Sequence, residues 1–167
     1  MPLTEQEYID RIADLWPGPD EDSSWDLILL AEEAVQAFPQ SPELWWYLGF
    51  ALCRIDPDSR PLTIRRLDCL RRVVELDRGH ADAHEEIGYL LDTYFDDFHG
   101  AEEAFRDAIA SGAGVDSYVG LARVLAQMGR REEALSLLAT LSSPDATHPS
   151  VINMTNELNE GIWEQRP

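Results

Sequence analysis

The 167-residue chain contains no lysine: all 13 of its basic residues are arginine, and they stand against 32 acidic residues. Lysine codons are AT-rich, so this absence indicates a GC-rich, bacterial genome rather than a functional choice. The formal net charge of -19 repels DNA, RNA and anionic lipid surfaces, and it excludes them as main partners. A basic protein or peptide remains compatible with this charge.

Cysteine and long apolar runs are also scarce. Cys53 and Cys69 form neither a CxxC pair nor a metal-binding spacing, and both lie among apolar residues, so we expect buried thiols. No run of about 18 apolar residues occurs, and residues 1–15 are acidic rather than a basic stretch followed by an apolar one. We therefore expect no transmembrane helix, no signal peptide and a cytoplasmic location.

Apolar residues recur at helical spacing almost throughout the chain, and no alternating pattern predicts a strand. Thr4 and Glu7 form a capping box at the start of the first helix. Clusters of Pro, Gly, Ser and Asp divide the rest, including a turn at residues 56–61. In the second helix we expect Trp25, Leu29 and Ala34 to face inward. The later helices are predicted at 24–38, 42–55, 62–76, 81–95, 100–110, 115–128, 131–141 and 150–163.

A short motif recurs about every 34 residues, and self-similarity at this period is typical of stacked helical hairpins. In its first half a small residue follows an apolar one directly, and its second half carries spaced alanines, so two helices can approach closely. One hairpin cannot bury both of its faces, so the hairpins must stack. The small residues concerned are Gly49, Gly88, Ala101, Ala108, Ala122 and Ala134.

These residues resemble the tetratricopeptide repeat (TPR) family, in which each repeat is a pair of antiparallel helices. The best-matching segment carries Tyr118, Leu121, Ala122, Leu125, Gly129, Ala134, Leu138 and Leu141. Residues 81–110 match with one extra residue in the turn. Residues 42–77 match in the first helix only, because Arg66 stands where the family usually has Ala. Residues 24–39 look like the second half of a degenerate repeat.

The resemblance implies an all-α fold, a TPR-like right-handed superhelix of antiparallel helix hairpins, or α-solenoid. We expect a single domain over residues 1–167. It would comprise an N-terminal helical pair at 1–40, three repeats at 42–141 and a C-terminal capping helix at 150–164. Glu157, Glu160 and Glu164 are expected to keep the outer face of that cap in water.

By the same resemblance, the first helices of the repeats line a concave groove. Its positions are Glu43, Trp46, Phe50, Cys53, Asp82, Glu85, Tyr89, Asp92, Asp116, Val119, Arg123 and Gln127. Some family members hold the C-terminal carboxylate of a chaperone with a cluster of Lys, Arg and Asn. Here Glu85 and Asp92 occupy such positions, and ionised carboxylates cannot donate hydrogen bonds, so we expect no clamp of that kind.

The groove instead suits a ligand that carries Arg or Lys and an apolar anchor. Carboxylates can accept bidentate hydrogen bonds from Arg, and aromatic rings can bury apolar side chains or stack on a guanidinium. Two alternatives remain. Trp46 and Phe50 could instead be core residues that pack against the N-terminal helices. Glu85 and Asp92 could instead form a solvated face. The candidate partner-binding residues are Trp46, Phe50, Glu85, Tyr89, Asp92 and Arg123.

Charge is distributed unevenly along the chain. Residues 1–40 and 75–105 each carry ten acidic residues and one Arg, whereas residues 54–72 carry six Arg and three Asp. The basic patch comprises Arg65, Arg66, Arg71 and Arg72. We expect it to pair with acidic residues of neighbouring helices, each exposed pair contributing ~0.2–1 kcal/mol. A phosphate or an acidic partner is the alternative.

Catalytic signatures are missing. His80 and His84 have a metal-compatible spacing of four, but no third ligand stands at a defined interval. No glycine-rich phosphate loop follows a strand. We therefore expect no metal, no cofactor and no enzymatic activity. The sequence predicts a non-catalytic module that binds a basic and aromatic protein or peptide segment. The alternative is a dedicated chaperone or immunity protein that sequesters one cognate effector or toxin.

Overall fold

The computed structural model describes residues 3–19, 21–56 and 59–165, and all regular elements within these ranges are helical. The predicted all-α fold of helical hairpins is therefore confirmed. The chain divides into two compact units, residues 1–78 (unit 1) and 79–167 (unit 2). None of the helices in the described ranges combines the length and the apolar character needed to cross a bilayer. A single domain over the whole chain stays a prediction.

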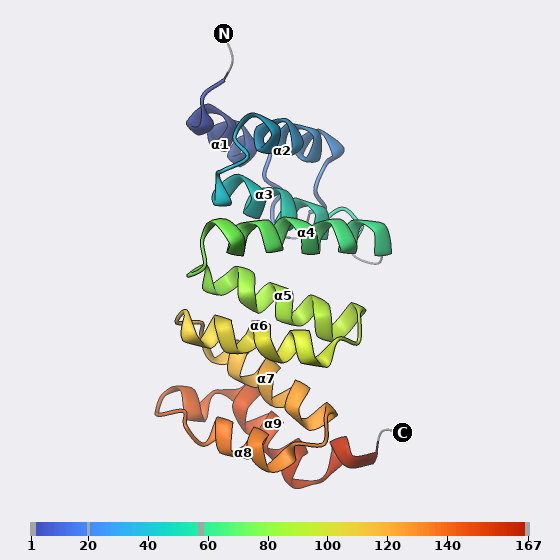
Figure 1. Ribbon diagram of the computed structural model, residues 1–167, viewed down its shortest axis with the longest axis vertical. Helices are drawn as coiled ribbons and strands as arrows, with labels where there is room; N and C mark the ends of the chain where they lie inside the picture. Colours follow the sequence, from blue (N-terminus) through green and yellow to red (C-terminus); the bar gives the residue numbers. More distant parts are fainter. Residues whose placement is uncertain (1–2, 20, 57–58, 166–167) are drawn as a thin grey trace. The chain divides into compact units, whose positions relative to one another are not determined.

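Unit 1 consists of α1 (Glu5–Asp14), α2 (Trp25–Ala37), α3 (Pro42–Cys53) and α4 (Arg60–Leu76), and each helix contacts the next (Figure 1). The predicted capping box is present, since Thr4 Oγ1 accepts from the Glu7 backbone N–H at 3.3 Å and the Glu7 carboxylate accepts from the Thr4 N–H at 2.7 Å. Helix α4 begins two residues earlier than predicted. Pro61 falls in its first turn, where a missing N–H costs no hydrogen bond. Pro57 and Asp58 of the predicted turn lie outside the described residues.

The inner face of α2 differs from the prediction. Ala34 is fully buried as predicted, but Trp25 and Leu29 are 58% and 60% exposed. Helix α2 is apolar on most of its circumference, so helical periodicity alone does not select one stripe. The stripe that packs into the core of unit 1 carries Leu27, Ile28, Ala31, Ala34 and Val35.

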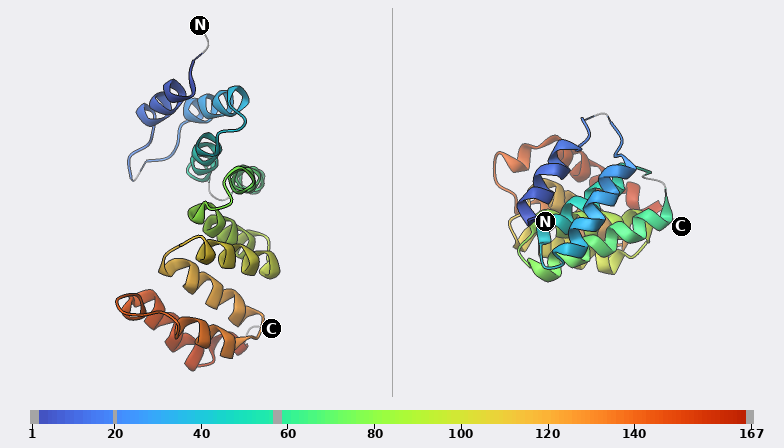
Figure 2. Two further views of the ribbon diagram at one scale, coloured as in Figure 1. Left: turned by 60° about the vertical axis from the view of Figure 1, so that its left-hand side comes forward. Right: turned by 90° about the horizontal axis from the view of Figure 1, so that it is seen from above.

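Unit 2 consists of two hairpins and a further helix, seen side-on in Figure 2. The elements are α5 (Ala81–Tyr94), α6 (Phe98–Ala110), α7 (Val115–Gln127), α8 (Arg131–Leu138), the 3-10 turn η1 (Asp145–Thr147), α9 (Pro149–Asn159) and the 3-10 turn η2 (Ile162–Gln165). Helix α6 begins early because Asp97 Oδ1 accepts from the Gly100 N–H at 3.0 Å. Helix α9 ends four residues before the predicted end, since Gly161 adopts a left-handed φ of 70°.

The centre of unit 2 is the ring of Phe105, which is fully buried between α5 and α7. A Cβ atom added at Gly88 would lie 2.9 Å from this ring, and one added at Gly120 would lie 2.5 Å from it. Both helices therefore need glycine at the point where the ring touches their backbones. The close approach at Gly88 was expected from the repeat motif, whereas the motif did not indicate Gly120.

We expect Gly120→Ala to destabilise unit 2 by about 1–2 kcal/mol. Overpacking a rigid core costs about 1–3 kcal/mol, and the better helix propensity of alanine offsets up to about 1 kcal/mol of that. Urea denaturation followed by circular dichroism measures the loss. In a Phe105→Leu background the same substitution should cost less, because the smaller side chain leaves room for the Cβ. An equal loss in both backgrounds would contradict the proposed clash.

A ring of four charged side chains joins α6 to α8. Glu102 is 6% exposed, and both of its carboxylate oxygens accept from Arg130 Nη1 at 2.7 Å. Arg106 also donates to Glu102, and Glu133 accepts from Arg106 at 2.9 Å and from Arg130 at 2.7 Å. The buried carboxylate of Glu102 is thus compensated on two sides.

Candidate functional site

The first residue pair of the expected groove that the structure brings together is Asp92 of α5 and Arg123 of α7. Asp92 is 7% exposed and accepts from Arg123 Nε at 2.8 Å and from Gln127 Nε2 at 2.7 Å. Its two oxygens are therefore both engaged inside unit 2. Asp92 holds Arg123 in place, and it does not present an unpaired carboxylate to a ligand.

Tyr89 connects this pair to the core. Its ring lies edge-on to Phe105 with 5.0 Å between centroids, and its hydroxyl donates to the backbone oxygen of Asp116 at 3.0 Å. The guanidinium carbon of Arg123 lies 5.5 Å from the ring centroid of Tyr89. Burial raises the pKa of Tyr89 to about 12, so the phenol is neutral across the physiological range. The ring of Tyr89 thus packs against the guanidinium group of Arg123.

Glu85 lies on the same face of α5, one turn before Tyr89. It is half-buried and accepts a hydrogen bond from the hydroxyl of Ser117, which is fully buried on α7. Partial burial raises the pKa of Glu85, and the charges of Asp116, Glu86 and Asp82 act in the same direction, whereas the Ser117 hydrogen bond opposes them. Four carboxylates, Asp82, Glu85, Glu86 and Asp116, thus lie close enough to influence one another here.

A cavity of about 450 Å³ opens between α7 and α9 beside Arg123. Its walls combine apolar side chains with two neutral polar residues, the guanidinium of Arg123 and the carboxylate of Glu157. The lining residues are Val119, Arg123, Ser150, Asn153, Met154, Glu157, Ile162 and Trp163. Val119 and Arg123 occupy predicted groove positions, so this cavity adjoins the predicted groove and adds residues of α9 to it.

The prediction that Glu157 faces away from the repeats is wrong, because it lines this cavity with residues of α7. Glu160 is exposed, as expected, and the side chain of Glu164 lies outside the described part of the chain. Sequence reasoning missed the contribution of α9 to the groove. The signal was present, since Ser150, Asn153, Met154 and Glu157 follow helical spacing along one face.

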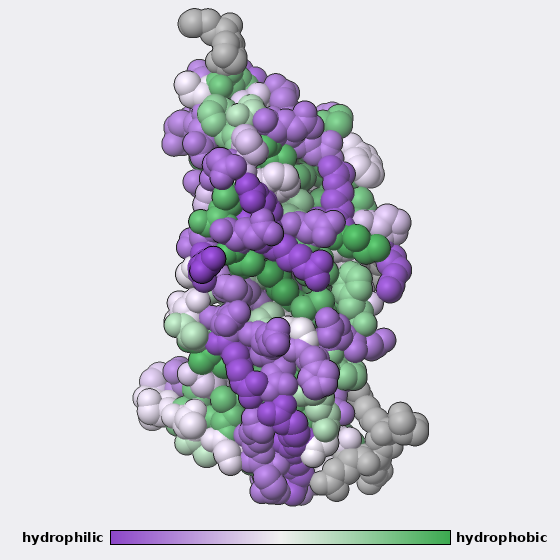
Figure 3. All heavy atoms as spheres, viewed as in Figure 1, coloured by the Kyte–Doolittle hydropathy of each residue, from purple (hydrophilic) through white to green (hydrophobic). Residues whose placement is uncertain are grey.

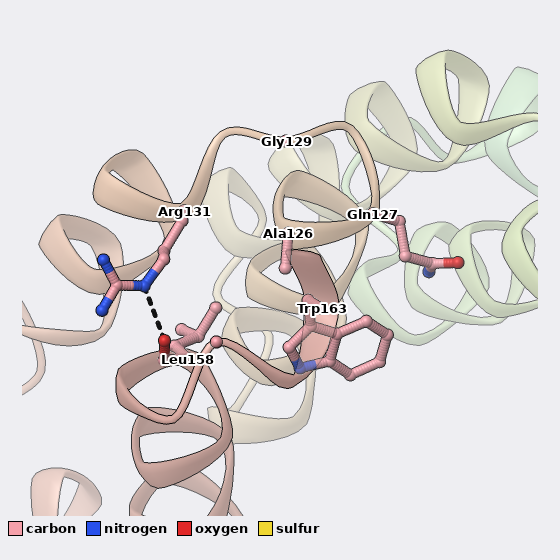
Figure 4. Close-up of a pocket in the computed structure, with 7 residues that line it drawn as sticks. Ala126, Gln127, Gly129, Arg131, Leu158 and Trp163 are labelled. Carbon is pink, nitrogen blue, oxygen red and sulfur yellow. Dashed lines mark hydrogen bonds between the residues drawn. The ribbon is translucent and has the colours of Figure 1, made fainter. Parts of the chain in front are cut away.

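The indole of Trp163 separates this cavity from a second one of about 190 Å³, shown in Figure 4. Ala126 and Gln127, at the end of α7, line the second cavity. Arg131 Nε donates to the backbone oxygen of Leu158 at 2.6 Å, which ties the end of α9 to the start of α8 (Figure 4).

Trp46 and Phe50, the two remaining candidates, lie in unit 1. Phe50 stacks on Trp16, with 5.8 Å between centroids and an interplanar angle of 25°, and Trp46 lies 6.0 Å from Phe50. The segment that follows α1 therefore packs against Phe50, and Trp46 joins the same aromatic cluster through Phe50. Each side chain remains partly exposed. A role of either residue in partner binding stays a prediction.

The two histidines that drew attention in the sequence have local contacts. His80 caps α5, because its Nδ1 accepts from the Ala83 N–H at 3.2 Å. His84 Nδ1 lies 4.0 Å from the carboxylate of Asp107. Across the ranges that the structure describes, no three His, Cys, Asp or Glu side chains gather in a way that would hold a metal ion.

Comparison with known proteins gives matches at the level of structure alone. No protein-family model matches the sequence, and no curated protein matches it. MamA superposes with a TM-score of 0.60 at 19% identity, over 93% of this chain and 72% of that one. YrrB, described as a TPR protein with an unusual peptide-binding site, gives 0.63 at 18% identity over 79% and 66%.

A third solved structure is TTC0263 of Thermus thermophilus, described as a thermophilic TPR protein. It matches with a TM-score of 0.51 at 16% identity, over 95% of this chain and 99% of that one. Identities below 20% establish a common fold and do not transfer a binding site or a partner. The chain has the fold of the tetratricopeptide repeat proteins, as its spaced small and apolar residues predicted.

Proposed function

We propose that the protein is a non-catalytic binding module that takes a basic and apolar segment of another protein into the groove of unit 2. The observation that carries this proposal is the cavity between α7 and α9. Val119, Met154 and Trp163 offer an apolar wall, and Glu157 places a carboxylate on the same cavity. Apolar clefts with a few polar groups are the usual form of a binding site.

The charge of the groove supports a basic ligand. Asp92 and Arg123 neutralise each other, so the remaining charge comes from Asp82, Glu85, Asp116 and Glu157. These carboxylates lie on α5, α7 and α9, the helices that face the groove. Carboxylates favour Arg or Lys on the partner, and they speed its approach at low ionic strength.

The candidate residues take different parts in this proposal. Glu85 and Glu157 attract the cation, whereas Asp92 and Tyr89 hold the side chain of Arg123 in position. A positioned side chain loses less conformational freedom on binding, so the groove is partly preorganised. The peptide-binding site reported for YrrB, which shares this fold, agrees with a peptide ligand but does not specify its sequence.

We expect Glu157→Lys to weaken the binding of an Arg-flanked peptide with a central Leu-Trp pair by about tenfold or more, because charge reversal in a half-buried cavity removes an attraction and adds a repulsion. Fluorescence anisotropy of the labelled peptide measures the affinity. Glu160→Lys is the matched control, since it makes the same charge change at an exposed position directly after the end of α9.

Three results would speak against the proposal. If Glu157→Lys and Glu160→Lys weaken peptide binding equally, the loss comes from the net charge of the protein and not from the cavity. A Glu-flanked peptide that loses as much affinity on Glu157→Lys as the Arg-flanked one would remove the preference of unit 2 for a basic ligand. Affinity that is unchanged between low and high salt would contradict the electrostatic contribution. The wild-type protein should lose affinity as salt rises.

A further inference from the structure

Unit 1 contains a cavity of about 390 Å³ between α2 and α4, with residues of α3 at its base. Its floor is apolar and is made by Val35, Trp45, Leu48 and Cys69. Burial raises the pKa of the Cys69 thiol to about 12, so the sulfur acts as part of an apolar surface rather than as a nucleophile. The volume falls in the range of ligand-binding clefts.

The apolar surface extends beyond this cavity along α2. Trp25 and Leu29 are more than half exposed, and they share one stripe of the helix with Glu32 and Gln36, which line the cavity. From residue 25 to residue 36 the stripe is about 16 Å long at 1.5 Å per residue. Figure 3 shows one face of the molecule, on which apolar side chains lie exposed among polar ones. A stripe of this length fits a peptide better than a small molecule.

The polar rim of the cavity carries two arginines, Arg65 and Arg72, and two carboxylates, Glu32 and Asp68. Glu32 pairs with Arg65, and Asp68 lies 3.9 Å from Arg71. Arg72 donates to Glu75 at 2.9 Å and to the backbone oxygen of Pro39 at 3.4 Å. A guanidinium carries five N–H groups, so each arginine on the rim keeps donors for a further acceptor.

The wider charge pattern points the same way. Six of the 13 arginines fall within residues 54–72, in a chain whose net charge is -19. An acidic partner is repelled by most of the molecule and meets its most favourable surface on α4. Arg65 and Arg72, both on the rim, stand about 10 Å apart along the helix axis, with the apolar floor between them.

We propose that the α2–α4 face of unit 1 is a docking site for an acidic peptide segment of a partner protein. The segment would place an apolar side chain in the cavity and a carboxylate on either side of it, one toward Arg65 and one toward Arg72. A further apolar residue would cover Trp25 and Leu29. This site is independent of the groove in unit 2, and it selects the opposite charge.

The test uses two labelled peptides that share a central Leu-Trp-Leu and differ in their flanks, which are Glu in one and Arg in the other. The full-length protein should bind the Glu-flanked peptide, and Trp25→Ser with Leu29→Ser should weaken that binding by about tenfold or more. These two side chains are exposed, so the fold should be retained, and circular dichroism checks this.

Arg72→Glu should give a similar loss, whereas Arg11→Glu makes the same charge change on α1, away from the cavity, and should have little effect. Binding of the Glu-flanked peptide that is insensitive to both cavity variants would overturn the proposal. So would a larger change in affinity, in either direction, on Glu157→Lys than on Arg72→Glu, which would place the peptide in unit 2.

A small organic acid separates a peptide site from a metabolite site. 4-Phenylbutyrate carries an apolar body and one carboxylate, but it cannot span the stripe from the cavity to Trp25. If millimolar phenylbutyrate leaves most of the peptide bound, the result supports the extended site. If phenylbutyrate displaces the peptide completely at a concentration equal to that of the peptide, the proposal is overturned in favour of a small-molecule pocket.

Discussion

Phe105→Ala is expected to lower the free energy of unfolding of unit 2 by about 3–5 kcal/mol, the usual cost of removing a fully buried phenylalanine. The ring contacts both glycines that face it and lies edge-on to Tyr89. Its removal leaves a void between α5 and α7, which are held apart by other contacts and can close only in part. Urea denaturation monitored by circular dichroism measures the loss.

Phe105→Leu is the graded control, because it keeps an apolar side chain and should lose clearly less than the alanine variant. Binding of the Arg-flanked peptide should also weaken in Phe105→Ala, since Tyr89 loses the surface on which it rests and Arg123 loses part of its support. A loss below about 1 kcal/mol for Phe105→Ala would show that unit 2 repacks around the void.

Glu102→Ala is expected to cost about 1–3 kcal/mol at pH 7, because it leaves Arg106 and Arg130 without their buried partner. The side chains of these arginines are 47% and 37% exposed, so water compensates part of the loss and the value stays below that of a fully buried pair. Glu133 still pairs with both arginines in the variant.

The cost should depend on pH in a defined direction. Burial by itself would raise the pKa of Glu102, but the hydrogen bonds from Arg130 and Arg106 outweigh it and hold the pKa below its ordinary value of 4.5. A depressed pKa adds stability above the unfolded-state value, and this stability is lost as the pH falls through the folded-state value. The difference between wild type and Glu102→Ala should therefore shrink below about pH 4.5.

Glu103→Ala is the neighbouring control, since Glu103 is exposed on the same helix. It should have a small effect at every pH. A deficit of Glu102→Ala that is constant from pH 7 to pH 3 would mean that the lost contribution is packing rather than charge. The measurement is the denaturation midpoint at a series of pH values for the three proteins.

Much of the fold could be predicted from the sequence because the relevant signals are local. Apolar spacing located the nine α-helices of the described residues, and Pro, Gly and capping residues located most of their ends to within a few positions. The inner face of α2 could not be predicted in this way, since that helix is apolar almost all round. Which stripe is buried depends on the positions of α1 and α3.

The candidate site was harder to predict because its chemistry depends on pairing between helices. Glu85, Tyr89, Asp92 and Arg123 do lie near one another in unit 2, in keeping with the expected groove positions. The sequence did not indicate that the carboxylate of Asp92 pairs with Arg123, which lies 31 positions further along the chain. Nor did it show that Phe50 would stack on Trp16, although packing of that kind was one of the two alternatives.

The contrast between the two thiols provides a reporter of motion. Cys53 is partly exposed, whereas Cys69 is 2% exposed and protonated up to about pH 12. A maleimide reagent should modify Cys53 quickly and reach Cys69, on the floor of the cavity between α2 and α4, only when that cavity widens. In a Cys53→Ser protein, the labelling rate of Cys69 would thus report how often unit 1 opens under native conditions. A peptide seated between α2 and α4 should slow that rate.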